Sequence, residues 1–211
     1  MVYDNVKMRN CSRCAEPISH CTCPNEYLDA HYMHRLIKVT RYLHDTELPQ
    51  NKLIYSLKHE RRRDVLSLLT EELCASVRHA LSETDSLLVT YIPRGRRSLA
   101  AHGFDHAARL SRSVARRLGA EFAPLLRSTA RRAQKELSGR QERVKNATME
   151  LRGRRDLTGR RILLIDDIVT TGASMANAAA LLRGEGAREI IGAAVAIAYY
   201  DAYTPFEDSH F

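Results

Sequence analysis

The sequence has 211 residues, 44% of them hydrophobic, and a formal net charge of +8 at pH 7. This length suffices for one compact domain with a buried core and a small appendage. The charge excludes neither nucleic acid nor small phosphorylated ligands as partners. Arg strongly outnumbers Lys among the 33 basic residues, and Arg suits phosphate binding. The alternative is codon usage in a GC-rich genome, which favours Arg over Lys.

Nothing in the sequence indicates export or membrane insertion. No apolar run preceded by basic residues opens it, so no secretory signal is visible. The longest apolar stretch, IIGAAVAIAYY over 190–200, contains Gly and is too short to span a bilayer. We therefore expect a cytoplasmic protein that makes no membrane contact.

A cysteine cluster occupies the first segment, residues 1–30, which has too little apolar material for a core of its own. Four thiolates in a cytosolic protein favour a metal over disulfides, and they suit tetrahedral Zn²⁺. His20 or His31 could replace one Cys, and disulfides, free thiols or an iron–sulfur cluster are the alternatives. The expected ligands are Cys11, Cys14, Cys21 and Cys23.

The next segment, residues 31–85, is expected to be a helical connecting region. Apolar side chains at helical spacing predict a short amphipathic element over 31–44, and a longer apolar stripe predicts a helix over 63–82. Cys74 lies alone in that helical pattern and is most simply a small helix residue.

Strands and helices alternate over residues 86–211, which we take as the main domain. Strands that alternate with helices imply crossover connections and a parallel sheet covered on both faces, so the fold class is α/β and Rossmann-like. Strands are predicted over 86–93, 121–127, 161–166 and 190–200, and helices over 104–120 and 173–186.

The stretch ILLIDDIVTTGAS over 162–174 carries the strongest chemical signal. An apolar strand leads into Asp166 and Asp167, at the strand end where parallel sheets bind ligands. Two adjacent carboxylates accept hydrogen bonds from vicinal hydroxyls, and a helix N-terminus attracts phosphate. The pattern predicts a site for a ribose with a 5′-phosphate, and neither G-x-G-x-x-G nor G-x-x-x-x-G-K-[ST] occurs there. The phosphate-binding candidates are Thr170, Thr171, Gly172, Ala173 and Ser174.

This order of strand, two acids and Thr-Thr-Gly resembles the signature of the type I phosphoribosyltransferases. The resemblance implies that Asp166 and Asp167 act as catalytic residues and hold the ribose hydroxyls of phosphoribosyl pyrophosphate (PRPP). It also implies that residues 170–174 hold the 5′-phosphate. Mg²⁺ would arrive with PRPP, bridging pyrophosphate and ribose oxygens.

Further stretches resemble the competence protein ComF branch of this family. AQKELSGRQERVKNA over 133–147 resembles its mobile loop, with Gln134, Arg143 and Asn146 at matching positions. Closure of such a loop would exclude water from the reacting atoms. Lys58 matches a Lys of the branch, and the plain alternative is a solvated surface Lys. The branch often carries a four-Cys element, usually closed by C-x₂-C where this sequence has C-x-C.

A last stretch, YIPRGRRSLAAHGFDHAARL over 91–110, resembles the branch's pyrophosphate loop, with Gly103 and Phe104 matching. Asp105 would bring negative charge near the leaving group and so hinder pyrophosphate handling, unless it turns away or helps to hold Mg²⁺. Three residues replace the usual Arg, Asn and Gln: His102, Asp105 and His106. Three basic residues would compensate: Arg94, Arg96 and Arg97.

Two functions follow from these features. The first is a phosphoribosyltransferase that transfers phosphoribose from PRPP to an unidentified acceptor and releases pyrophosphate. The alternative is a PRPP-binding, non-catalytic ComF-like accessory or regulator in DNA uptake or nucleic-acid processing, which the net charge and the cysteine cluster favour. Nucleic acid and a second copy of the chain are both open as partners.

Overall fold

The computed structural model describes residues 10–43, 48–95, 99, 103–129, 149–153 and 155–198. Several sequence expectations lie outside these residues, namely those for Arg96, Arg97, His102, Gln134, Arg143 and Asn146. Among the described residues, the elements in chain order are α2 (Glu26–Ala30), β1 (Leu36–Tyr42), α3 (Pro49–His59), α4 (Arg63–Ala80), β2 (Leu87–Tyr91), α6 (His106–Leu118), β3 (Glu121–Phe122), β4 (Leu126–Ser128), β5 (Met149–Leu151), β6 (Arg161–Val169), α8 (Ala173–Gly184) and β7 (Glu189–Ala198).

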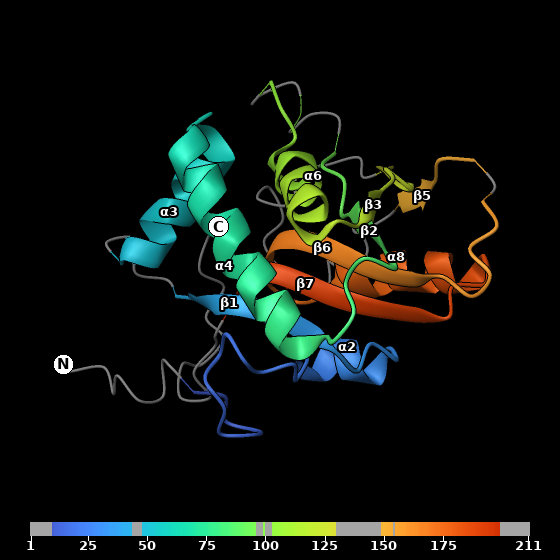
Figure 1. Ribbon diagram of the computed structural model, residues 1–211, viewed down its shortest axis with the longest axis horizontal. Coiled ribbons are helices and arrows are strands. Elements are labelled where there is room, and N and C mark those ends of the chain that lie inside the picture. The colour runs from blue at the N-terminus through green and yellow to red at the C-terminus, as the bar shows by residue number, and fades with distance from the viewer. Residues whose placement is uncertain are drawn as a thin grey trace.

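A five-stranded sheet in the order β1-β7-β6-β2-β3 forms the centre of the fold (Figure 1). Every pair of neighbouring strands in it is parallel. In the register of the sheet, Ile165 of β6 lies between Tyr91 of β2 and Ala193 of β7. Strands β4 and β5 form a separate antiparallel pair. The α/β class and the parallel sheet expected from the sequence are confirmed.

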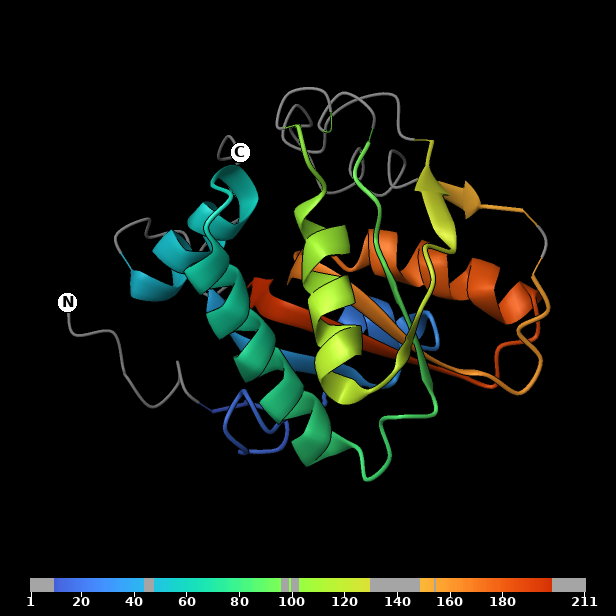
Figure 2. The same cartoon turned by 45° about the horizontal axis from the view of Figure 1, so that its top comes forward.

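Helices cover both faces of the sheet because side chains along each strand alternate between the faces. Leu163 and Ile165 of β6 pack into the cluster formed with α3, α4 and α6. Ile162 and Leu164 pack into the opposite cluster, with α2 and α8. Figure 2 shows α4 and α6 side by side on one face of the sheet. Each fully buried Leu or Ile contributes about 1.5–3 kcal/mol, so β6, which is buried on both faces, anchors the core.

The helix that follows β2 illustrates how local sequence sets these elements. The Asp105 carboxylate accepts a hydrogen bond from the Ala108 N–H at 3.1 Å and so caps α6. Leu110 and Val114, four residues apart, are fully buried against the sheet. Gly119 ends the helix with a φ of 70°, a left-handed conformation that glycine adopts without strain.

The amphipathic helical element expected over 31–44 is wrong. Residues Leu36–Tyr42 instead form β1, the edge strand that pairs with β7. Leu36 and Ile37 are both buried but belong to opposite core clusters, as adjacent strand residues do. A short apolar run does not distinguish a helix from a strand by spacing alone. The division into segments 1–30, 31–85 and 86–211 stays a prediction, although β1 belongs to the central sheet.

The strand expected over 121–127 is divided into two elements. β3 pairs with β2, whereas β4 pairs with β5 in the other sheet. Pro124 lies between them and has no N–H to donate to a ladder, which accounts for the break.

None of the helices in the described part of the chain is long and apolar enough to cross a membrane.

Candidate ligand site and cysteine cluster

The candidate ligand site lies where the direction of the chain connections reverses. From β2 the chain passes through α6 to β3, and from the neighbouring β6 it passes through α8 to β7 on the other side. Helices α6 and α8 also cover opposite faces of the sheet. Open parallel sheets bind ligands beyond the carboxyl ends of the strands at such a switch point.

The acid pair lies at this switch point. β2 ends at Tyr91, which pairs with Ile165, so Asp166 and Asp167 lie beyond the carboxyl end of β2. The Asp167 N–H donates to Asp166 Oδ1 at 2.8 Å, and the Ile168 N–H donates to Asp167 Oδ1 at 2.6 Å. Asp167 is 7% exposed. The two carboxylates are thus fixed against the backbone of their own strand.

Two nitrogen atoms, one from Lys58 and one from His106, contact the far oxygen of Asp167. Lys58 Nζ, from the last turn of α3, lies 3.3 Å from Asp167 Oδ2. His106 Nε2, from the first turn of α6, contacts the same oxygen and is itself buried. Burial raises the pKa of Asp167, but Lys58 and His106 outweigh it and hold that pKa well below its usual range. Asp167 therefore combines a lowered pKa with two contacting nitrogen atoms from other elements.

Asp166 has the opposite electrostatic character. Burial, and then the charge of Asp167, raise its pKa well above the ordinary range for an aspartate. Lys58 lowers this pKa only in part. Two adjacent carboxyls whose pKa values are pushed apart mark a candidate functional site. Asp166 is also the less buried of the two acids.

Arg94 supplies a half-buried guanidinium close to both acids. Burial lowers its pKa, and the charges of Asp167, Asp105 and Asp166 raise it. Its Nη1 atom is buried and has no hydrogen-bond partner within the described part of the chain. A buried donor without a partner is costly, so this group is suited to an anionic ligand.

The loop between β6 and α8, residues 170–172, contains three of the residues that the sequence predicts to bind phosphate and is called the phosphate loop. Gly172 is the N-cap of α8, with a φ of 87° that favours glycine. The Thr171 hydroxyl accepts a hydrogen bond from the Ala173 N–H at 3.2 Å and so holds the first turn. The N–H groups at the start of the helix carry partial positive charge, which favours a phosphate.

Phe104, next to the matching Gly103, is held between two guanidinium groups. Arg61 Cζ lies 5.2 Å and Arg109 Cζ 5.3 Å from the centre of its ring, within the range of cation–π attraction. Arg61 Nη2 also donates to the Gly103 carbonyl at 2.9 Å. This part of the expected pyrophosphate loop is thereby fastened to the segment that follows α3.

The sulfur atoms of the four N-terminal cysteines lie within 4.8 Å of one another. Tetrahedral zinc with Zn–S bonds of about 2.3 Å would place its sulfurs roughly 3.8 Å apart, which is compatible with this spacing. Lys38, a buried residue of β1, donates from Nζ to Cys21 Sγ at 3.2 Å and to the Cys23 carbonyl at 2.8 Å. Its charge would offset part of the negative charge of four thiolates. The four cysteines could therefore hold a metal such as zinc.

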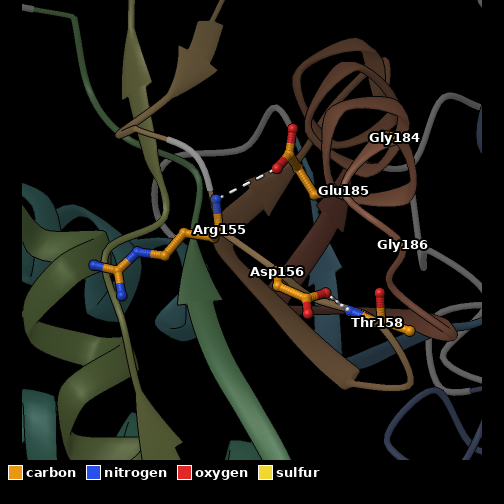
Figure 3. A pocket seen from close by; sticks show the side chains of 6 residues that line it. All are labelled: Arg155, Asp156, Thr158, Gly184, Glu185 and Gly186. Carbon is orange, nitrogen blue, oxygen red and sulfur yellow. Dashed lines mark hydrogen bonds between the residues drawn. The ribbon is translucent and has the colours of Figure 1, made fainter.

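A shallow pocket lies at the opposite end of α8 from the phosphate loop. Figure 3 shows the Glu185 carboxylate accepting a hydrogen bond from the Arg155 N–H, while the Arg155 guanidinium points away. The twelve residues of α8 place this pocket about 18 Å from Gly172. It is therefore separate from the acid pair. It is lined by Arg155, Asp156, Thr158, Gly184, Glu185 and Gly186.

The structure brings together four of the predicted site residues, Lys58, Arg94, Asp166 and Asp167. It also reveals contacts that the sequence analysis missed. His106 was noted only as a replacement for Gln, and its burial against Asp167 could not be read from its position. Asn25 and Leu28, from the N-terminal segment, contact the phosphate loop, and no local pattern indicated this.

An open parallel sheet with an acid pair and a helix N-terminus at its switch point is typical of proteins that bind nucleotides or sugar phosphates. The Phosphoribosyl transferase domain family matches residues 105–210, half of the chain. The chain belongs to this family. The resemblance to type I phosphoribosyltransferases is thus confirmed.

Relatives with curated names cover most of the chain. DNA utilization protein YhgH of Escherichia coli O157:H7 is 30% identical over 190 residues, which are 85% of this chain and 80% of that protein. YhgH of E. coli K12 is 29% identical over 187 residues, with the same coverage. These relatives are ComF-like, as the sequence analysis expected. Adenine phosphoribosyltransferase from Leishmania tarentolae matches 74% of this chain and 90% of its own length, at 13% identity and a TM-score of 0.43.

Proposed function

We propose that this chain binds PRPP at the switch point between β2 and β6. The observation that carries the proposal is the meeting of three groups there. The acid pair lies in β6 beyond the end of β2, the N-terminus of α8 follows it, and the buried Nη1 of Arg94 has no partner among the described residues. Each group suits one part of PRPP: the ribose hydroxyls, the 5′-phosphate and the pyrophosphate.

The contacts of Asp167 support a division of labour within the acid pair. Its far oxygen is occupied by Lys58 and His106, so it orients these groups and holds the site together. Asp166 then accepts the hydrogen bonds of the ribose hydroxyls. The N–H groups at the start of α8, with Thr170 and Ser174 beside them, receive the 5′-phosphate.

As an enzyme, the chain transfers phosphoribose to an acceptor and releases pyrophosphate. Positive charge that develops at the ribose C1 is stabilised by the negative charge of the acid pair. Arg94 stabilises the negative charge of the leaving pyrophosphate. The Mg²⁺ that accompanies PRPP would supply further positive charge to the pyrophosphate.

A second candidate function is that of a PRPP-binding accessory in the handling of DNA. The name of the YhgH relatives, DNA utilization protein, favours it, and so does the net charge of +8. Binding that depends on Arg–phosphate contacts weakens steeply with salt, because counterions are released from the DNA. Competence or DNA uptake would be the corresponding process.

Pyrophosphate release from PRPP, assayed against a panel of bases and nucleosides, separates the two functions. Turnover that Asp166→Asn abolishes would identify the enzyme and its acceptor. PRPP binding without turnover, together with DNA binding that falls between 50 and 200 mM salt, would identify the accessory. A protein that neither binds nor turns over PRPP would contradict both.

A further inference from the structure

The N-terminal segment reaches the phosphate loop through one asparagine. Asn25 Nδ2 donates hydrogen bonds to the carbonyl oxygens of Thr170 at 3.3 Å and Thr171 at 3.2 Å. The other side-chain atom, Oδ1, accepts from the Leu28 N–H at 2.9 Å and so caps α2. One side chain therefore starts α2 and ties it to a loop about 145 residues further along the chain.

The same helix fills the space behind Gly172. Leu28 is completely buried, and a Cβ atom added at Gly172 would lie 2.7 Å from Leu28 Cγ. Real Cβ atoms do not approach carbon so closely, so the absence of a side chain at Gly172 lets α2 and the loop touch. Leu28 belongs to the core cluster that also contains Met175 and Ala176 of α8.

The cysteine cluster holds α2 in this place. Lys38 Nζ donates to the Cys23 carbonyl, two residues before Asn25. Arg13, between the first two cysteines, donates to the Pro24 carbonyl at 3.1 Å and to Asp29 of α2 at 3.0 Å. These hydrogen bonds connect the cysteine cluster to the residues just before Asn25 and to Asp29 within α2.

We propose that Asn25 is a positioning residue for the 5′-phosphate, and that the cysteine-rich segment is therefore a structural part of the ligand site. The carbonyl oxygens of Thr170 and Thr171 point toward Asn25. In a peptide group the N–H lies on the side opposite the carbonyl, so the N–H groups of this loop then face the ligand. The proposal rests on the proposed function, in that it assigns the phosphate of PRPP to this loop.

Asn25→Ser tests the proposal, because Ser still caps α2 but donates no hydrogen bond to both carbonyls. The metal-loaded, full-length protein would be titrated calorimetrically with ribose 5-phosphate and, separately, with pyrophosphate, each with Mg²⁺. We expect ribose 5-phosphate affinity to fall about tenfold, which is about 1.4 kcal/mol, with pyrophosphate affinity unchanged. The affinity of Asn25→Asp for ribose 5-phosphate should fall further, because this substitution adds negative charge behind the loop. Glu26→Gln, at an exposed position of the same helix, is the matched control.

Hydrogen exchange of the unliganded protein provides a readout independent of the ligand. Amides of residues 170–173 should exchange faster in Asn25→Ser than in the wild type or Glu26→Gln, with zinc content and melting temperature unchanged. If the wild type binds ribose 5-phosphate and Asn25→Ser matches it in affinity and exchange, the positioning role is overturned and the proposed function stands. If exchange rises but even the wild type binds no ribose 5-phosphate, the link to the loop stands and the assignment of the phosphate fails. A loss of affinity that is equal for pyrophosphate would also overturn the proposal, since it indicates general unfolding.

Discussion

The imidazole of His106 contacts the carboxylate of Asp167 across the gap between α6 and β6, and both side chains are buried. Lys58 approaches the same oxygen from α3. Three elements that are separate in sequence are therefore joined at one carboxylate. The neighbouring Asp166 is left with a raised pKa and without comparable partners among the described residues. This asymmetry makes the two acids distinguishable by experiment.

Substitution of the two acids should change stability in opposite directions. Asp167→Asn leaves Lys58 and His106 without their shared acid, so it should lower the free energy of unfolding by about 3 kcal/mol at pH 7. Asp166→Asn removes the repulsion between the two acids, so it should raise the free energy of unfolding by about 1 kcal/mol. Such a gain is expected where a functional residue lowers stability. Urea unfolding of the unliganded proteins measures both. Equal effects of the two substitutions would contradict the division of labour.

The pH dependence of the same variants follows from the two pKa shifts. Asp166 has a raised pKa, so its protonated form contributes stability that is fully present below pH about 4 and is lost as the pH rises through the folded-state value. The advantage of Asp166→Asn should thus vanish toward pH 4. Asp167 has a lowered pKa, so its contribution is present above pH about 4 and is lost only as the pH falls further. The part of the Asp167→Asn deficit that comes from the Asp167 charge should therefore persist above pH about 4 and shrink only below it.

Gly172→Ala should weaken binding of ribose 5-phosphate by disturbing the back of the loop. The added methyl group would clash with Leu28 rather than with the ligand, and the positive φ adds strain. We expect a loss of about 1–3 kcal/mol in stability as well as a loss of affinity. The double variant Gly172→Ala with Leu28→Ala should recover part of the affinity, because the clash is removed. Absence of any recovery would indicate that the methyl group blocks the phosphate directly.

Asp105, which the sequence places near the pyrophosphate unless it turns away or helps to hold Mg²⁺, has structural partners of its own. Its carboxylate caps α6 and accepts a hydrogen bond from the Arg94 N–H at 3.4 Å. Asp105→Asn, which preserves the cap, should therefore change pyrophosphate affinity by less than about threefold. Asp105→Ala should cost about 1 kcal/mol of stability through loss of the cap. A tenfold gain in pyrophosphate affinity in Asp105→Asn would restore the repulsion argument.

The cysteine cluster should carry about one zinc per chain, measurable by elemental analysis, and Cys11→Ser or Cys14→Ser should remove it. Lys38→Met should lower zinc affinity by about 10–100-fold in competition with a chelator, because it removes a buried donor to Cys21 Sγ. Lys52→Met, at an exposed position of α3, is the control. Protein purified without chelator and free of metal would contradict this assignment.

Much of the fold could be predicted from the sequence, since the alternation of strands and helices beyond residue 85 specifies a parallel sheet. β1 was missed because Leu36 and Ile37, buried on opposite faces, also satisfy a helical spacing. The acid pair and the loop were recognised because their spacing is local. The partners of Asp167 were not, because α3 and α6 bring Lys58 and His106 to it only in three dimensions. The contact of Asn25 with Thr171 spans 146 residues and leaves no local signal.

Calorimetric titration of the metal-loaded wild type with PRPP and Mg²⁺ tests the central claim most directly. We predict saturable binding of one PRPP per chain, lost in Asp166→Asn although that variant is more stable than the wild type. The melting temperature of the wild type should rise with PRPP by mass action. Absence of heat and of any thermal shift at millimolar PRPP, or undiminished binding in Asp166→Asn, would contradict the account.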